Sequence, residues 1–330
     1  MEHRRLGTSD LELPVATFGA WAIGGLFWGG TDDQQAIEAI HAAIDHGVDA
    51  IDTAPIYGRG HSETVVGQAI RGKRDKLKIL TKCGIRWDID EGEHHFTLPA
   101  PGGGEVTAHR FLKADSVIHE CEQSLKRLDI DVIDLYQVHT PSESATAEET
   151  MGALVKLQQQ GKIRHIGVSN YNSRQMAAAL EHAPVVSNQI MYSALIREIE
   201  KDELPFCRKH GLGVICYSPM ALGLLSGKMT MDRTFPETDI RSRKQWFQPE
   251  NRKRILDTLE TIRPLADRHK ATLGQLAIAW VIAQEGITTA LVGARNAAQA
   301  VENAAAAALR LSPEDVQFIG QAFAELNMPR

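Results

Sequence analysis

Short apolar runs alternate with amphipathic helical stretches along the whole chain, and this alternation restricts the folds that the sequence can adopt. The stretch 32–46, for example, places Ile37, Ile40 and Ile44 on one helical face. Strands that alternate with helices are joined by right-handed crossovers and form a parallel sheet. Eight runs have the length and composition of buried strands: 15–19, 48–51, 77–81, 133–138, 163–168, 184–189, 212–217 and 288–293.

Eight strand–helix units predict closure of the sheet into a (β/α)8 TIM barrel, preceded by an N-terminal β-hairpin. No linker or shift in composition divides the chain, so we expect residues 1–330 to form a single domain. A doubly wound sheet is the alternative fold. Against it, the glycines at 24–25 and 29–30 lack the Gly-x-Gly-x-x-Gly spacing that would follow the first strand of a Rossmann fold.

Two segments, 84–113 and 218–249, are too long and irregular to be ordinary turns of a barrel. Both follow predicted strands, so we expect them to be long loops at the C-terminal face of the barrel, where they would form the walls of a pocket. Disordered insertions are the alternative. The apolar side chains Trp87, Phe96, Trp246 and Phe247 argue against disorder.

Composition excludes several classes of protein. The 36 basic and 42 acidic residues give a net charge of −6, and no long basic run is present to bind nucleic acid. No secretory signal and no membrane-spanning apolar segment is apparent, so we expect a cytoplasmic protein, with a monomer as the default. The cysteines have neither disulfide nor zinc-ligand spacing, and Cys83 is interpreted as a packing thiol.

Four polar side chains, Asp52, Tyr57, Lys82 and His139, form a candidate proton-transfer set. Asp52, Lys82 and His139 each follow an apolar run directly, so a barrel would bring them to the same face. A cation such as Lys82 lowers the pKa of a phenol, and Asp52 can hold the lysine protonated. The set therefore predicts a tuned general acid for an oxygen that gains negative charge, although each residue taken singly also has an ordinary structural interpretation.

The same residues carry a family resemblance. The segments 47–58, 79–82 and 134–141 resemble the signature segments of the aldo-keto reductases, as do 161–171, 188–189, 217–219 and 292–296, in the same order. The resemblance implies a barrel that uses NADPH or NADH without a Rossmann domain and that reduces aldehydes and ketones reversibly by hydride transfer. It implies that Tyr57 donates the proton, that Lys82 and Asp52 set the acidity of Tyr57, and that His139 orients the carbonyl.

By the same resemblance, Ser169, Asn170 and Gln189 bind the nicotinamide carboxamide, Tyr217 stacks on the ring, and the loop 218–228 wraps the pyrophosphate. A nucleophile elbow at Ser169 is the rival interpretation, but its final glycine is missing. The complete expected set of cofactor-binding residues is Gly19, Ala20, Trp21, Asp52, Ser169, Asn170, Gln189, Tyr217, Ser218, Pro219, Leu222, Gly223, Leu225, Gly227, Lys228, Gly293, Ala294, Arg295, Gln299 and Asn303.

The choice between NADPH and NADH rests on one segment. A strand ends and a helix begins near Arg295, where free backbone N–H groups attract phosphate. Family members that bind the 2′-phosphate carry basic side chains here, and this chain has Arg295 but Gly293 and Gln299 at the matching positions. We therefore expect NADPH, with NADH possible.

The substrate pocket is expected to include Trp21, Tyr57, Trp87, His139 and Trp246 and to accept a small carbonyl compound. No metal is expected, because the adjacent histidines 94–95 beside two glutamates are more typical of a solvated loop than of a metal site. The rival function is a cofactor-binding regulatory subunit with little turnover, as in the potassium-channel β subunits, which resemble the same family.

Overall fold

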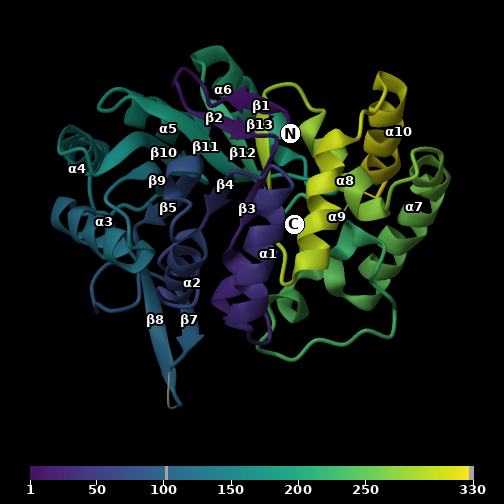
Figure 1. The fold of residues 1–330 in the computed structure, drawn as a ribbon, viewed down its shortest axis with the longest axis horizontal. Helices are drawn as coiled ribbons and strands as arrows, with labels where there is room; N and C mark the ends of the chain where they lie inside the picture. Colours follow the sequence, from purple (N-terminus) through teal and green to yellow (C-terminus); the bar gives the residue numbers. More distant parts are fainter. Residues whose placement is uncertain (101–102, 327–330) are drawn as a thin grey trace.

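The computed structural model describes residues 1–100 and 103–326, and its centre is a closed barrel of parallel strands (Figure 1). Each strand overlaps one of the predicted apolar runs, so the predicted TIM barrel is confirmed and the doubly wound alternative is wrong. In order around the wall the strands are β3 (Ala16–Gly19), β4 (Ala50–Asp52), β5 (Lys78–Cys83), β9 (Ile133–Val138), β10 (Ile163–Ser169), β11 (Val185–Met191), β12 (Gly213–Tyr217) and β13 (Ile287–Val292), which pairs back onto β3.

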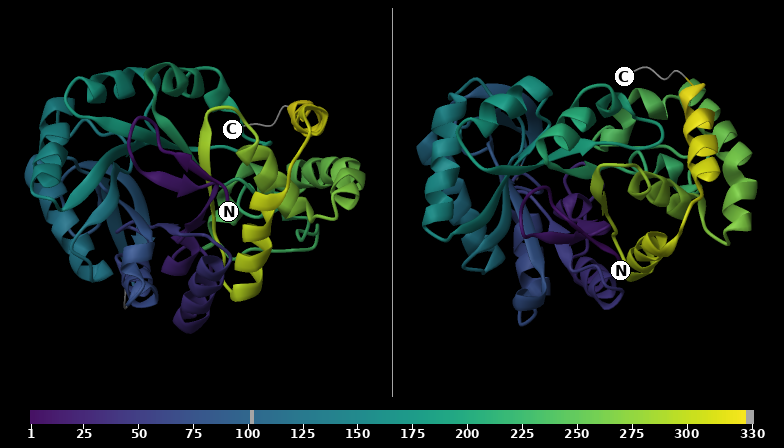
Figure 2. Two further views of the ribbon diagram at one scale, coloured as in Figure 1. Left: turned by 45° about the horizontal axis from the view of Figure 1, so that its top comes forward. Right: turned by 90° about the horizontal axis from the view of Figure 1, so that it is seen from above.

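Helices surround this barrel. Figure 2 shows two further helices, one green and one yellow, that lie side by side outside the layer of helices around the barrel. The outer pair is α7 (Pro249–Arg268) and α10 (Pro313–Ala324), which cover α8 and explain why α8 is almost wholly apolar. The other helices are α1 (Asp33–Asp45), α2 (His61–Ile70), α3 (Ala114–Leu128), α4 (Ala147–Gln159), α5 (Ser173–Leu180), α6 (Glu203–His210), α8 (Leu273–Ile282) and α9 (Ala297–Ala305).

The predicted N-terminal hairpin is present as the antiparallel pair β1 (His3–Arg5) and β2 (Glu12–Pro14). Its side chains Leu6 and Leu13 are fully buried in one cluster with Leu80 and Leu135 from inside the barrel. Gly7 allows this close approach, because a Cβ there would lie 2.7 Å from the carbonyl oxygen of Gly211. The hairpin therefore plugs the amino end of the barrel, which leaves the carboxyl end for a binding site.

The segment 84–113 is not the irregular loop that the sequence predicts. It forms a three-stranded antiparallel sheet of β6 (Ile85–Arg86), β7 (Glu93–Pro99) and β8 (Glu105–Arg110), which projects beyond the barrel in Figure 1. The sheet is anchored because Leu98 and Ala108 are buried in one cluster with Ala54 and Ile56 from the loop after β4. Residues 101–102, within this predicted loop, lie outside the described residues.

The segment 218–249 contains short 3₁₀ turns rather than a regular element: η4 (Leu224–Ser226), η5 (Ile240–Arg243) and η6 (Gln245–Phe247). It is fixed to a neighbouring loop, since the Ile240 N–H donates to the Phe27 carbonyl at 3.2 Å. Within the segment, Arg241 forms two hydrogen bonds to Asp239, at 2.9 and 2.6 Å. These contacts are inconsistent with a disordered insertion.

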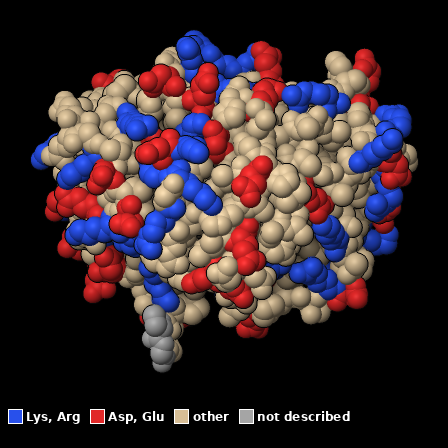
Figure 3. Space-filling model, in the orientation of Figure 1, with Lys and Arg blue, Asp and Glu red and all other residues tan. Residues whose placement is uncertain are grey.

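The surface carries both signs of charge. On the face shown in Figure 3, lysine and arginine side chains are interspersed with aspartate and glutamate. Among the described residues, no helix is long and apolar enough to cross a membrane.

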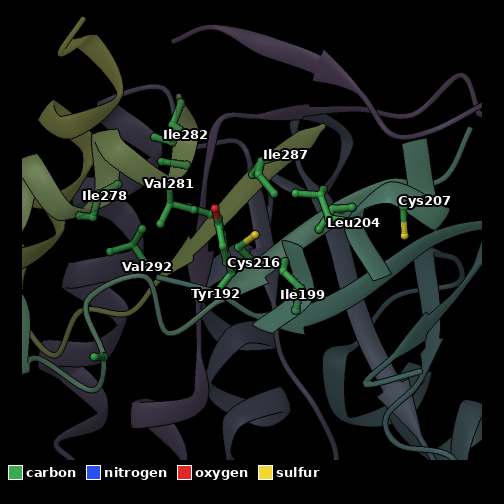
Figure 4. Close-up of a cluster of buried hydrophobic side chains, with 14 of the residues drawn as sticks. Tyr192, Ile199, Leu204, Cys207, Cys216, Ile278, Val281, Ile282, Ile287 and Val292 are labelled. Carbon is green, nitrogen blue, oxygen red and sulfur yellow. The ribbon is translucent and has the colours of Figure 1, made fainter. Parts of the chain in front are cut away.

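The largest apolar core fills the space between the barrel and the outer helices. Figure 4 shows part of it, where Ile278 and Val281 of α8 lie with Cys216 of β12 around Tyr192. All four cysteines of the chain are buried free thiols, as the packing interpretation of Cys83 predicts. The barrel is therefore a packed scaffold on which the carboxyl-end loops are mounted.

Candidate active site

A buried ion pair lies at the centre of the carboxyl-end face. Asp52 ends β4 opposite Leu80 of the adjacent β5, and Lys82 follows two residues later on the same face of the sheet. The Lys82 Nζ is 2.5 Å from Asp52 Oδ1 and also donates to the Thr53 carbonyl at 2.9 Å. The side chains are 0% and 2% exposed, so both charges depend on each other for compensation.

The second carboxylate oxygen of Asp52 is held by two amides. Gln189 Nε2 of β11 donates to it at 2.8 Å, and Gln137 Nε2 of β9 donates at 3.1 Å. Gln137 is fully buried and was not among the predicted site residues. The feature of the sequence that could have identified Gln137 is its position, as a polar side chain inside the apolar run 133–138 and two residues before His139. The amides fix the orientation of Asp52 and, through it, the position of Lys82.

Tyr57 and His139 lie in front of this pair, on the cavity side. The Lys82 Nζ is 5.1 Å from the centroid of the Tyr57 ring, and the Tyr57 and His139 ring centroids are 5.7 Å apart. Tyr57 is held by a close backbone approach, because a Cβ at Gly24 would lie 2.6 Å from the Tyr57 carbonyl carbon. The structure thus brings the four predicted residues together.

The electrostatics differ from the sequence-based expectation in one respect. Burial, reinforced by the negative charge of Asp52, raises the pKa of Tyr57 well above its ordinary value. The predicted lowering by Lys82 is therefore not seen: burial also lowers the pKa of Lys82, and Asp52 only partly opposes that effect. Burial and the nearby Lys82 hold the pKa of His139 well below its usual range. At neutral pH the site presents a protonated phenol and a neutral imidazole.

A cavity of about 1030 Å³ opens above these groups, at the upper end of the size typical for ligand pockets. Most of the predicted binding residues line it. They are Gly19, Ala20, Trp21, Asp52, Tyr57, His139, Ser169, Asn170, Gln189, Tyr217, Ser218, Pro219, Leu222, Gly223, Lys228, Gly293, Arg295, Gln299 and Asn303.

Five residues of the predicted cofactor and substrate sites do not line the cavity. The side chains of Leu225 and Trp246 are buried in the main core, and Ala294 is buried in a second apolar cluster. Gly227 faces Leu273, which a Cβ would approach to 2.9 Å. Trp87 packs against the cluster beneath the three-stranded sheet. Trp87 and Trp246, both predicted for the substrate pocket, are thus not among the residues that line this cavity.

Amide and hydroxyl groups form a connected set at the inner end of the cavity. Tyr217 donates from its hydroxyl to Asn170 Oδ1 at 2.9 Å, and Asn170 Nδ2 donates to the His139 carbonyl at 3.0 Å. Ser169 donates to the Gln189 carbonyl at 2.9 Å. Such groups can exchange partners to bind the donors and acceptors of a ligand carboxamide.

The outer end of the cavity lies at the start of α9. Asn296 caps the helix by accepting from the Gln299 N–H at 3.0 Å, and the Gln299 side chain accepts from the Arg295 N–H at 3.0 Å. The Arg295 side chain is exposed there, and Lys228 pairs with Glu302 across the rim. A helix N-terminus with an adjacent guanidinium has the chemistry of a phosphate site, and the cavity is large enough to hold a dinucleotide.

Several aromatic rings in the cavity wall were missed by the sequence analysis as site residues. Phe27, Trp28 and Phe96 line the cavity together with His95. Phe27 and Trp28 stand side by side in a glycine-rich loop directly after the first barrel strand, which is the signal that could have identified them. Among the described residues, no group of three or more His, Cys, Asp or Glu side chains is placed to hold a metal ion.

Comparisons with known proteins give one family. The model of the aldo/keto reductase family matches residues 16–323. The NADH-specific methylglyoxal reductase of Escherichia coli is 37% identical over 316 residues, which cover 94% of each chain. The aldo-keto reductase yakc [NADP(+)] of Schizosaccharomyces pombe is 31% identical over 97% of this chain and 90% of its own. The solved glycerol dehydrogenase AKR11B4 of Gluconobacter oxydans superposes with a TM-score of 0.87 at 36% identity, covering 98% of this chain and 96% of that one.

Proposed function

The chain belongs to the aldo/keto reductase family, whose members are NAD(P)H-dependent oxidoreductases, and we propose that it reduces aldehydes and ketones with NADPH, using Tyr57 as the proton donor. The observation that carries the proposal is the position of Tyr57. Its ring faces both the cavity and His139, and a buried lysine–aspartate pair lies behind it. This is the arrangement that a general acid for a carbonyl oxygen requires.

The chemistry follows from the protonation states. When bound, the nicotinamide cofactor supplies the hydride to the carbonyl carbon. Tyr57 remains protonated at neutral pH and hydrogen-bonds to the carbonyl oxygen, to which it gives its proton as negative charge develops there. The neutral His139 ring has one N–H donor that orients the same oxygen. Lys82, held by Asp52, stabilises the phenolate that remains after proton transfer.

The remaining lining residues hold the cofactor in this proposal. Ser169, Asn170 and Gln189 would bind the carboxamide of the nicotinamide, and the Tyr217 ring would pack on its face. Arg295 would bind the 2′-phosphate that distinguishes NADPH from NADH. The names of the relatives above give different cofactors, NADH for one and NADP(+) for the other, so they do not decide between the two. The preference for NADPH proposed for this chain therefore rests on Arg295.

Replacing Arg295 with alanine is expected to weaken NADPH binding roughly ten- to a hundredfold, the range for losing a hydrogen bond to a charged group. NADH affinity should change less than about twofold, because NADH lacks the 2′-phosphate. Fluorescence titration of each cofactor measures both values. Arg263→Ala on α7 is the matched control, because Arg263 pairs with Glu260 outside the cavity. An equal loss for both cofactors would show that Arg295 does not select NADPH.

The activity itself is tested by incubating the chain with NADPH and a panel of aldehydes and ketones. We expect alcohol to accumulate in the same amount as NADPH is consumed. If NADPH binds but no compound in a broad panel is reduced, the chain is a cofactor-binding subunit rather than a reductase.

A further inference from the structure

Aromatic rings extend away from the proton donor along one wall of the cavity. The centroid of Trp21 lies 6.2 Å from that of Tyr57, and Trp28 packs edge-on against Trp21 at 5.2 Å. These rings line the cavity and are only partly buried, so some of their apolar surface is free. The surface next to the reacting oxygen is therefore aromatic.

A second group of rings comes from two other segments. Phe27 packs edge-on against Phe96 of β7 at 6.0 Å, and His95 lies 4.8 Å from Phe96. The Phe27 backbone has a φ of 68°, in the left-handed region that a bulky side chain seldom adopts. Its carbonyl is held by the Ile240 N–H, so the surrounding loop keeps the ring in this position. The aromatic walls are thus preformed, which lowers the cost of binding a ligand between them.

Charged groups near these rings are already compensated or lie at the rim. Arg241 is paired with Asp239, and its guanidinium lies 4.4 Å from the Phe235 ring centroid and 5.2 Å from that of Trp28. Glu105 and Arg243 also line the cavity, but both are exposed to solvent. A charged substituent would therefore lose its water beside Tyr57 without meeting an unpaired buried charge of opposite sign among the described residues.

We infer that the substrates are neutral carbonyl compounds with an apolar ring close to the carbonyl carbon, such as aryl aldehydes, rather than small polar compounds such as methylglyoxal. The inference rests on the proposed function of the same site. With the carbonyl oxygen at Tyr57 and His139, the substituent on the carbonyl carbon extends toward the rings. An aryl group there removes apolar surface from water on both the substrate and the wall.

The first test compares kcat/KM for benzaldehyde and methylglyoxal with the wild-type chain and NADPH. We expect kcat/KM to be at least about tenfold higher for benzaldehyde, which is within the discrimination that a hydrophobic pocket supplies. An equal or higher value for methylglyoxal would overturn the inference while leaving the proposed reductase function intact. Absence of turnover with both compounds and with all other carbonyls would instead overturn the proposed function, and the inference with it.

The second test removes one ring. Phe96→Ser is expected to lower kcat/KM for benzaldehyde roughly tenfold and to change that for methylglyoxal less than about twofold, because only the larger substrate reaches this wall. Phe96→Leu keeps an apolar side chain, so its kcat/KM for benzaldehyde should fall less. This variant separates loss of the apolar wall from a general folding defect. Phe318→Ser is the control, since Phe318 on α10 is 46% exposed and outside the cavity. Equal losses for both substrates in Phe96→Ser and Phe96→Leu would show a purely structural role for Phe96.

Discussion

Replacing Tyr57 with phenylalanine is expected to lower kcat for carbonyl reduction by roughly 10²–10⁴-fold, the contribution of a positioned general acid. The change deletes one oxygen and leaves the ring in place, so the contacts with Trp21 and His139 persist. A second phenol in the cavity, that of Tyr217, already donates to Asn170. Steady-state kinetics with NADPH, together with a fluorescence titration of cofactor affinity, separate loss of chemistry from loss of binding.

The matched control is Tyr171→Phe, which removes a phenol oxygen from a nearly buried side chain outside the cavity. We expect its turnover to remain close to that of the wild type. Cofactor affinity should be preserved in both variants. Turnover by Tyr57→Phe at the wild-type rate would mean that another group donates the proton.

Replacing Lys82 with methionine is expected to have the largest effect on stability. It leaves the Asp52 carboxylate buried with two amides but no cation, and removal of one partner from a buried ion pair costs about 3–5 kcal/mol. Turnover should fall as well, because no positive charge remains to stabilise the Tyr57 phenolate. Urea denaturation gives the free energy of unfolding, and the reductase assay gives the turnover.

Two further variants sharpen this experiment. The double variant Lys82→Met, Asp52→Asn removes both charges and should regain much of the stability without regaining activity. Lys78→Met, on the same strand, breaks a partly exposed pair with Asp49 and should cost less than about 1 kcal/mol. If Lys82→Met were as stable as Lys78→Met, the buried pair would not contribute as described.

The barrel could be predicted because its strands are buried on both faces and therefore read as continuous apolar runs. The three-stranded sheet of β6, β7 and β8 could not. Of the seven residues of β7 only Leu98 is fully buried, while His94 is exposed and His95 lines the open cavity, so the strand lacks a clear apolar face. The sheet is stabilised by contacts with Ala54 and Ile56, which lie far from β7 and β8 in the sequence.

The position of the catalytic candidates could be predicted for the same reason, since parallel strands end on one face. Their electrostatics could not, because the pKa of Tyr57 depends on the depth of burial and on its distance from Asp52. Loop tryptophans were equally ambiguous: Trp21 faces the cavity, whereas Trp246 packs into the core. The sequence marks such side chains as apolar but does not say which apolar surface they meet.

The most direct measurement of the central claim follows the hydrogen atom itself. The wild-type chain is incubated with benzaldehyde and NADPH that carries deuterium at both positions of the hydride-donating carbon, and the alcohol is analysed by mass spectrometry and NMR. Direct hydride transfer to a carbonyl held by Tyr57 and His139 predicts one deuterium on the carbinol carbon, attached to one face only. Alcohol formed without that deuterium, or with deuterium on both faces, would contradict the account.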